Sequence, residues 1–134
     1  MRIVLDTNIL LVSIPKKSPY RIIFDSLLHN KFELIISNDI LSEYTEIIAQ
    51  KTNHSIAVNV AEMLLSLSNV KKQEIFYKWN LIDIDKNDNK FVDCAIAGSA
   101  DYLVSNDKHF NCLKLIDFPQ LNLLTIDEFL ALLS

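Results

Sequence analysis

Short apolar runs alternate along the chain with stretches in which apolar residues recur at helical spacing. Such runs are typical of strands that are buried on both faces of a parallel sheet. The runs lie at residues 2–6, 32–37 and 101–107, and the helical spacing at residues 18–30, 37–48, 55–68 and 89–100. This alternation predicts an α/β fold with a mainly parallel central sheet.

Capping residues mark the start of several predicted helices. Ser18 and Pro19 offer a cap and a first-turn proline for the helix that ends near residue 30. Ser37 is suited to open the next helix. Thr125 and Glu128 have the spacing of a capping box, which predicts a helix at the end of the chain.

Two regions have weaker patterns. Residues 71–79 suit a short helix, and residues 80–85 suit an extended segment. Residues 113–117 and 122–125 are short apolar stretches of the kind found in edge strands. We therefore expect the sheet to be completed by strands from the C-terminal part of the chain.

The composition excludes several classes of binding site. A chain of 134 residues and 15.4 kDa has the size of one domain. Gly98 is the single glycine, which excludes a Walker A loop, a GxGxxG turn and a kinase glycine loop, because each needs several glycines near phosphate. Cys94, Cys112 and the three scattered histidines form no zinc-binding pattern.

No feature of the sequence suggests export or membrane insertion. Asp6 interrupts the N-terminal apolar stretch before it reaches the length of a signal-peptide core. No stretch approaches the roughly 18 apolar residues of a membrane span. Both cysteines fall in segments that we expect to be helical or buried, as reduced thiols commonly are. These observations favour a cytoplasmic protein.

Two aspartates follow predicted strands. Asp6 comes directly after the first strand, and Asp107 follows the strand at residues 102–105. Ligands of open parallel sheets bind at the carboxyl ends of the strands, so both acids lie where a functional site is expected. The alternative is that each aspartate only caps the helix that follows it.

Asp93 is the only charged residue between Lys90 and Asp101, and apolar residues surround it. The pattern predicts a buried carboxylate, which must be paired or bind a metal because burying it alone costs several kcal/mol or more. The alternative to a metal is an ion pair with the distant Arg2 or Arg21.

Two further acids have weaker signals. Glu43 lies about 40° from Ile47 around its helix, on the flank that turns toward the core. It could equally be an ordinary exposed glutamate. Asp88 precedes the helix at residues 89–100 and is either its cap or a group at the edge of a site. Asp83 and Asp85 are expected to be solvated loop charges.

Four segments together resemble the PIN-domain family, most closely its VapC-like toxins of toxin–antitoxin systems. The segments are IVLDTNILL (3–11), ISNDILSEYTEII (36–48), DKNDNKFVDCAIAGSADYLVSND (85–107) and LLTIDEFLALL (123–133). They occur in the order found in the family and cover the chain from end to end. The resemblance implies a three-layer α/β/α PIN-like domain over residues 1–134.

The resemblance also implies a set of site residues. The expected catalytic and metal-binding acids are Asp6, Glu43, Asp93 and Asp107. The expected supporting residues are Asn8, Asp88 and Ser105. Asn106 departs from the Thr or Gly that is frequent before the last aspartate, a local change that should not abolish the site.

The function that the resemblance implies is an endoribonuclease dependent on Mg²⁺ or Mn²⁺, with one or two ions. Such cations prefer carboxylate oxygens, and they lower the pKa of water for attack on a phosphodiester. Clustered carboxylates repel one another by roughly 3 kcal/mol per pair at about 5 Å, so the site needs a cation or retained protons. A type II toxin role, a cognate antitoxin and a homodimer are expected from the same resemblance.

The net charge of −4 argues only weakly against an RNA substrate. Removing the five candidate site acids from the 17 leaves 12, against 13 Lys and Arg residues. Lys16, Lys17 and Arg21 follow the first motif and are candidates for phosphate contacts, or else belong to a solvated loop. Aromatic residues such as Tyr20, Tyr77 and Trp79 either stack on bases or belong to the core or an interface.

Two other classes of function compete with the nuclease. A phosphoacceptor receiver domain is also a small α/β protein, but it needs an adjacent acid pair after the first strand, where LDTN offers one acid. A PIN-like RNA- or protein-binding module without catalysis would have lost some of its acids. Because all four expected acids are present, the sequence favours the nuclease.

Overall fold

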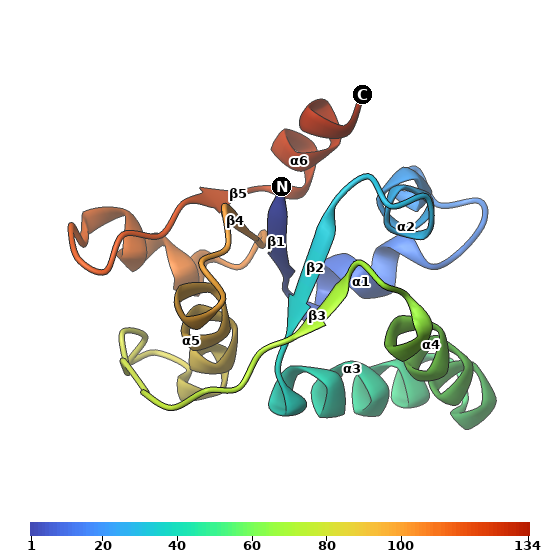
Figure 1. Ribbon diagram of the computed structural model, residues 1–134, viewed down its shortest axis with the longest axis horizontal. Helices are drawn as coiled ribbons and strands as arrows, with labels where there is room; N and C mark the ends of the chain where they lie inside the picture. Colours follow the sequence, from blue (N-terminus) through green and yellow to red (C-terminus); the bar gives the residue numbers. More distant parts are fainter.

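The computed structural model describes residues 1–134, and a five-stranded sheet runs through its centre (Figure 1). The strands are β1 (Arg2–Leu5), β2 (Glu33–Ile36), β3 (Val70–Lys72), β4 (Tyr102–Val104) and β5 (Leu123–Leu124). Their order is β3-β2-β1-β4-β5, and every neighbouring pair is parallel. The predicted α/β fold is confirmed, with a sheet that is wholly parallel.

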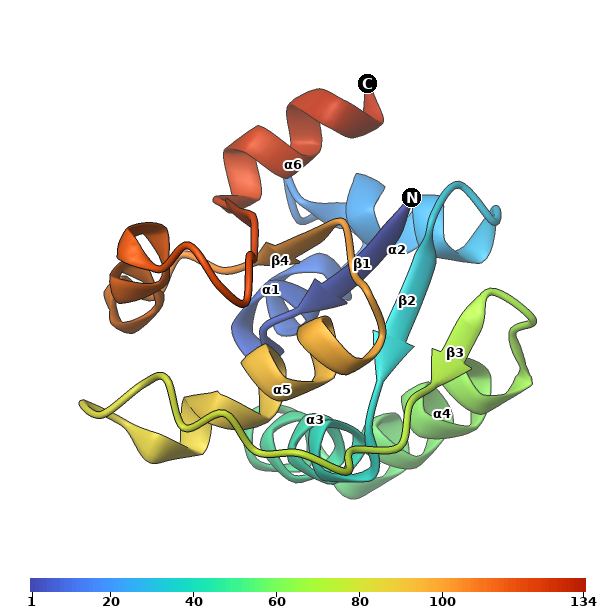
Figure 2. The same cartoon turned by 60° about the vertical axis from the view of Figure 1, so that its left-hand side comes forward.

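Helices cover both faces of this sheet. They are α1 (Thr7–Ser13), α2 (Arg21–Leu28), α3 (Asn38–Lys51), α4 (His54–Ser66), α5 (Asn89–Ala97) and α6 (Ile126–Leu133), with 3-10 helices η1 (Lys86–Asp88) and η2 (Lys108–Leu115). Helix α5 lies against one face, and α1, α2 and α4 lie on the other side (Figures 1 and 2). The three-layer architecture is therefore confirmed. None of these helices has the length and hydrophobicity needed to cross a membrane.

The strands form the centre of the core. Eight strand residues have no exposed surface, as expected for strands covered on both faces: Ile3, Val4, Leu5, Leu34, Ile35, Ile36, Leu103 and Val104. Removing this apolar surface from water is the main driving force of the fold. The buried runs fix β1 between β2 and β4, and so determine where the residues that follow β1 are placed.

Two of the predicted helix starts are confirmed. Ser37 accepts a hydrogen bond from the backbone N–H of Ile40 at 3.2 Å and caps α3. In the capping box of α6, Glu128 N–H donates to Thr125 at 3.2 Å, and the Glu128 carboxylate accepts from Thr125 N–H at 2.9 Å. Local side-chain hydrogen bonding decides both starts, which explains why the sequence could predict them.

Other predictions near the N-terminus were wrong. Helix α2 begins at Arg21 rather than near residue 18, because the Ser18 hydroxyl donates to the Val12 carbonyl and accepts from Tyr20 N–H at 3.1 Å. These bonds close a turn between α1 and α2 instead of a cap. The short helix α1, directly after Asp6, was not predicted.

Two predictions in the second half of the chain were also wrong. The proposed helix at residues 71–79 does not form, because β3 pairs with β2 and residues 73–85 follow without regular structure. Residues 113–117 form no strand, since Leu113 and Phe110 are buried one turn apart in η2. Both cysteines meet the expectation of a helical or buried position, since Cys94 is buried in α5 and Cys112 lies exposed in η2.

Candidate acidic site

The carboxyl ends of β1 and β4 bring Asp6 and Asp107 together. Leu5 pairs with Val104, and Asp6 N–H donates to the Val104 carbonyl at 3.0 Å. The buried Ser105 hydroxyl then donates to Asp6 Oδ2 at 2.7 Å and accepts from Asp107 N–H at 2.9 Å. Ser105 thus ties the first expected acid to the loop that carries the last one.

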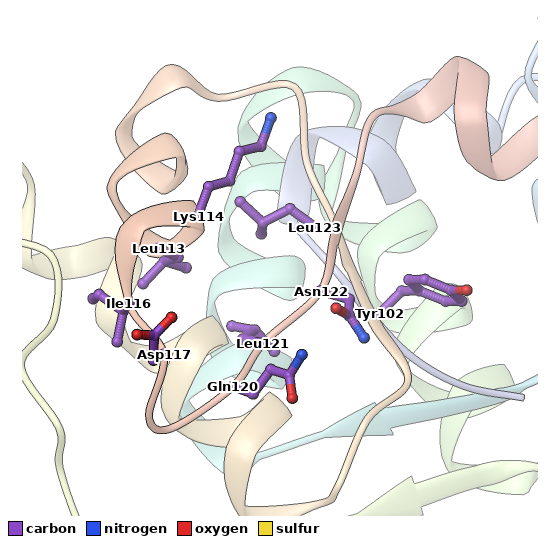
Figure 3. Close-up of a pocket in the computed structure, with 9 residues that line it drawn as sticks. All are labelled: Tyr102, Leu113, Lys114, Ile116, Asp117, Gln120, Leu121, Asn122 and Leu123. Atoms are coloured by element: carbon purple, nitrogen blue, oxygen red, sulfur yellow. The ribbon is translucent and has the colours of Figure 1, made fainter.

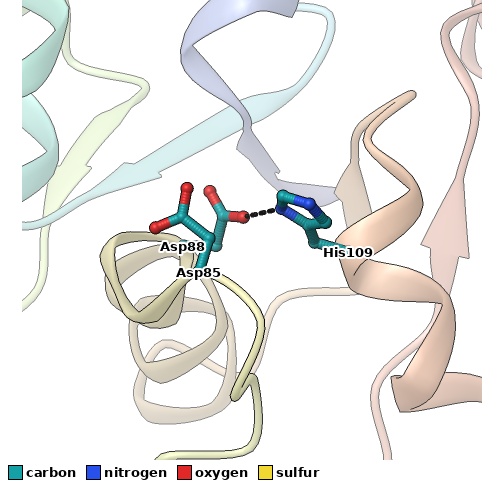
Figure 4. A group of neighbouring side chains, drawn as sticks. All are labelled: Asp85, Asp88 and His109. Atoms are coloured by element: carbon teal, nitrogen blue, oxygen red, sulfur yellow. Dashed lines mark hydrogen bonds and ion pairs between the residues drawn. The ribbon is translucent and has the colours of Figure 1, made fainter.

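Asp88 joins these acids from η1. His109 Nδ1 lies 3.0 Å from Asp88 Oδ2 and 3.4 Å from Asp107 Oδ1. The ligand atoms of Asp85, Asp88 and His109 all lie within 4.8 Å of one another (Figure 4). We call Asp6, Asp85, Asp88, Asp107 and His109 the acidic site.

Burial and like charges shift the protonation of this site. Burial raises the pKa of Asp6 to about 6, and the charges of Asp88 and Asp107 add to this effect against the Ser105 hydrogen bond. Burial also raises the pKa of Asp88, helped by Asp107 and Asp85 and opposed by the hydrogen bond with His109. Carboxylates are therefore held here at an electrostatic cost.

Glu43 of α3 lies at the edge of the acidic site. The hydroxyl of Thr7, the residue after Asp6, donates to its carboxylate. Asn87 Nδ2 donates to Glu43 Oε1 at 2.9 Å, and Lys90 Nζ lies 2.6 Å from the same oxygen. The Glu43 and Lys90 side chains are only 15% and 17% exposed, so this ion pair is largely shielded from water. Glu43 is therefore a fixed carboxylate, connected to Asp6 through Thr7.

Asp93 is buried, as predicted, with 5% exposure, but it lies outside the acidic site. It follows Asp88 by five residues, which turns it about 140° around the helix. Its Oδ1 accepts the backbone N–H of Trp79 at 3.0 Å. Burial raises the pKa of Asp93, and the Trp79 N–H and the charge of Lys78 oppose this rise.

The ion pairs considered for Asp93 do not form either. Arg2 pairs with Glu33 at 3.3 Å, and Arg21 pairs with Asp25 at 2.9 Å. A backbone N–H donor therefore satisfies the carboxylate instead of a distant arginine. This hydrogen bond could not be predicted from the sequence, because the Trp79 donor lies 14 residues away in a segment without regular structure.

Asp93 and Asn89 hold the same segment. Asn89 Oδ1 accepts Ile82 N–H at 2.9 Å, and Asn89 Nδ2 donates to the Ile82 carbonyl at 3.0 Å. Residues four apart share one face of a helix, so both side chains point from α5 toward residues 79–82. We call Asn89 and Asp93 the loop clamp.

A model of the family described as PIN domain matches residues 2–109. The chain belongs to the PIN-domain family. Among solved structures it is similar to a chain of VapBC2 from Rickettsia felis, bound to a DNA fragment from their promoter. The identity is 25% and the TM-score 0.64, over 93% of this chain and 98% of that chain.

Two further structures share the PIN-domain fold. VapBC-1 from nontypeable Haemophilus influenzae has 19% identity and a TM-score of 0.64, over 95% of this chain and 99% of that chain. Mycobacterium tuberculosis VapC20, a sarcin-ricin loop cleaving toxin, has 14% identity and a TM-score of 0.60, over 81% and 92%. No curated protein matches the chain significantly.

A cavity of about 300 Å³ opens onto the acidic site of this PIN domain. Asp6, Asn8 and Asp107 line it on one side, and its apolar wall includes Ile9 and Tyr20. Asn8 is exposed and makes no hydrogen bond to Asp6, so the supporting contact expected of it is absent. Thr7 and Ser105 make the contacts that fix the acids instead.

A larger cavity of the PIN domain, about 680 Å³, contains none of these acids. It lies between η2 and the edge of the sheet, and its charged lining residues are Lys114 and Asp117 (Figure 3). The size of a cavity therefore does not identify the acidic site in this fold, whereas the carboxyl ends of β1 and β4 do.

The basic residues that were expected to bind RNA differ in their surroundings. Lys16 and Lys17 are exposed in the turn between α1 and α2. Arg21 pairs with Asp25, donates to the Ile14 carbonyl and stacks over the Phe24 ring at 4.8 Å from its centroid. Because these contacts hold the Arg21 guanidinium in place, the two lysines are the better candidates for phosphate contacts.

Sequence reasoning missed four residues at or beside the acidic site. Thr7 follows Asp6 directly, and His109 follows Asp107 by two, so proximity to a candidate acid could have indicated both. Asp85 is exposed, as expected of a solvated charge, but its carboxylate also lies beside Asp88. Lys90 pairs with a residue 47 positions away, a contact that only the fold creates.

Proposed function

We propose that the protein is an endoribonuclease dependent on a divalent cation and the toxin of a VapC-type toxin–antitoxin pair. The crowding of Asp6, Asp88 and Asp107 at the carboxyl ends of β1 and β4 carries this proposal. Membership of the PIN-domain family and the similarity to a chain of VapBC2 support it.

The acids of the site fit Mg²⁺ or Mn²⁺. Both ions prefer carboxylate oxygens, and Asp6, Asp88 and Asp107 offer these oxygens at one place. Burial, with a smaller contribution from the neighbouring carboxylates, raises the pKa values of Asp6 and Asp88, and one or two bound cations would offset this cost of holding them ionised. We assign cation binding to Asp88 in place of Asp93, since Asp93 turns to the other side of α5.

The residues of the chain have distinct tasks in this proposal. Ser105 fixes Asp6 through its hydroxyl, and Thr7 and Lys90 fix Glu43. Glu43 orients the attacking water next to the scissile phosphate. A cation held by Asp6, Asp88 and Asp107 would neutralise charge on the phosphodiester and lower the pKa of water. Lys16 and Lys17 contact phosphates farther along the RNA.

Cleavage of a mixed RNA pool tests the proposal. The protein is incubated with Mg²⁺, with Mn²⁺ and with EDTA, beside variants Asp6→Asn, Asp88→Asn and Asp107→Asn. The matched control is Asp83→Asn, which removes an exposed acid outside the site. We expect cleavage with a divalent cation that EDTA and each site variant abolish and that Asp83→Asn retains.

Other results would reject the nuclease. Cleavage that survives EDTA and all three site variants would indicate a contaminant or a mechanism without the acidic site. No cleavage with either cation, with cation binding that calorimetry still detects, would indicate a PIN-like module that binds RNA or protein without cutting it.

The toxin role requires a partner. Leu65 and Ile56 of α4 are 58% and 36% exposed, and we propose that these apolar side chains lie in a homodimer or under an antitoxin. Sedimentation of the protein alone, and with the product of a neighbouring small reading frame, tests this. A monomer at every concentration, with no complex, would contradict the partner proposal.

A further inference from the structure

Three aromatic rings form a row on the surface, outside the acidic site. Tyr77 and Trp79 pack edge to face with ring centroids 4.8 Å apart, and Trp79 packs in the same way on Phe118 at 5.9 Å. Tyr77 is 65% exposed and Phe118 is 81% exposed. We call Tyr77, Trp79 and Phe118 the aromatic row. Large rings at such exposure usually face a binding partner.

The row is held in place by the fold. The loop clamp fixes the backbone of Trp79 and Ile82, and the Cys112 thiol donates to the Leu81 carbonyl at 3.8 Å. Segments 77–82 and 112–118 therefore lie side by side. Figure 2 shows the chain leaving β3, passing α5 and turning back into η1. The buried Asp93 thus positions a surface feature.

The same two segments lead to the acidic site. The first continues from Trp79 to Asp85, and the second begins after His109 and ends at Phe118. Six residues separate Trp79 from Asp85, so the chain can place them at most about 20 Å apart. A short RNA strand with its scissile phosphate at the acidic site could therefore reach the row.

The surroundings of the row favour RNA over an apolar protein segment. A cavity of about 470 Å³ adjoins Trp79 through Lys78 and Asp93, and Ile75 is its one apolar lining residue. Lysine and amide side chains dominate the lining, namely Lys78, Lys86, Lys90, Asn80 and Asn87. Asp39 and Asp93 are its two acids. Such donors suit phosphates and base edges, while the rings suit base faces.

We infer that the aromatic row is a stacking site for unpaired bases of the RNA substrate. Bases stack on the exposed rings of Tyr77 and Phe118, and the exposed Lys78 and Lys86 contact the phosphates between them. The inference rests on the proposed nuclease function, which it deepens by selecting single-stranded RNA.

Trp79 is the single tryptophan of the chain and reports on this site directly. Its fluorescence is followed while an unstructured oligoribonucleotide is added to the Asp6→Asn protein in EDTA, so that no strand is cut. We expect quenching that saturates. Substitutions Tyr77→Ala and Phe118→Ala should each weaken the affinity about five- to a hundredfold, and Phe118→Tyr should retain it. The matched control is Phe76→Ala, because Phe76 is 88% exposed but stacks on no ring of the row.

The outcomes separate this inference from the nuclease proposal. Cation-dependent cleavage by the wild type, with oligoribonucleotide affinity unchanged in Tyr77→Ala and Phe118→Ala, would overturn the stacking site and leave the nuclease standing. Ring-dependent quenching without any cleavage would support the stacking site and reject the nuclease. Quenching by a partner protein but not by RNA, or equal affinity for duplex RNA, would also overturn the inference.

Discussion

Asp88 ends η1 and Asp93 lies five residues later within α5, and the surroundings of the two aspartates differ. Asp88 is crowded by the charges of Asp107 and Asp85, and its partner is the His109 ring. Asp93 receives a backbone N–H from Trp79 and faces Lys78. Burial raises the pKa of both carboxyls, so burial alone does not identify a catalytic acid. The groups that face the carboxylate distinguish the two residues.

RNA cleavage gives the largest expected difference between the two aspartates. Asp88→Asn should lower cleavage at least about 100-fold, since even indirect partners of a metal contribute about 10- to 100-fold. Asp93→Asn should cleave at nearly the wild-type rate, because its amide oxygen can still accept the Trp79 N–H. Single-turnover rates on one RNA measure both. Equal losses of the cleavage rate in the two variants would contradict the different roles assigned to Asp88 and Asp93.

The pH dependence of stability tests the environment of Asp6 in the acidic site. The folded-state pKa of Asp6 is about 6 and its ordinary value is 3.8, so folding retains a proton that the unfolded chain releases. This stabilisation is fully present below pH 3.8 and is lost as the pH rises through about 6. Asp6→Asn cannot titrate there, so its stability relative to wild type should rise across this window by about 3 kcal/mol.

Urea unfolding in EDTA at several pH values measures this difference. Asp83→Asn is the control, because it removes an exposed acid outside the acidic site. A stability difference between Asp6→Asn and wild type that is constant, or that falls as the pH rises, would contradict the raised pKa of the buried Asp6 carboxyl.

Added Mg²⁺ or Mn²⁺ should stabilise the protein through Asp88 and not through Asp93. A cation at 100 times its Kd stabilises the folded state by about 2.7 kcal/mol. Wild type and Asp93→Asn should both gain this stability, whereas Asp88→Asn should gain little. Thermal unfolding with and without the cation provides the measurement. An equal gain in all three proteins would place the binding site away from Asp88.

Breaking the loop clamp should give the smallest effect on the free energy of unfolding. Asp93→Ala leaves the Trp79 N–H without its acceptor, which costs about 1–3 kcal/mol. Asn89→Ala leaves both backbone groups of Ile82 unpaired at a similar cost. Urea unfolding measures the loss, and Trp79 fluorescence reports whether the aromatic row has moved. An Asp93→Ala protein with unchanged stability and unchanged Trp79 fluorescence would show that the loop clamp neither stabilises the fold nor positions Trp79.

The parts of the fold that local chemistry determines could be predicted from the sequence. Unbroken apolar runs gave the central strands, and the caps at Ser37 and Thr125 gave two helix starts. Asp6 and Asp107 could be placed because parallel strands end at one edge of a sheet. The predicted single domain remains a prediction, which one cooperative unfolding transition would support.

The rest depended on contacts between distant residues. The apolar neighbours of Asp93 predicted its burial correctly, but they carry no information about Trp79, whose segment has no periodic pattern. The pairing of Lys90 with Glu43 and the approach of His109 to Asp88 likewise exist only once the layers have packed. Local patterns therefore predicted positions along the elements, and tertiary packing determined which acids meet.

The bond between Ser105 and Asp6 joins residues 99 positions apart, and this separation has a consequence for biosynthesis. A growing chain that has not yet reached β4 contains Asp6 and Glu43 but lacks the strand and the serine that hold Asp6. At about 5–20 residues per second, the ribosome completes the first three-quarters of the protein before the acids can assemble. The proposed nuclease would therefore be inactive until about three-quarters of its chain has been made, and incomplete chains released before that point would not cleave RNA.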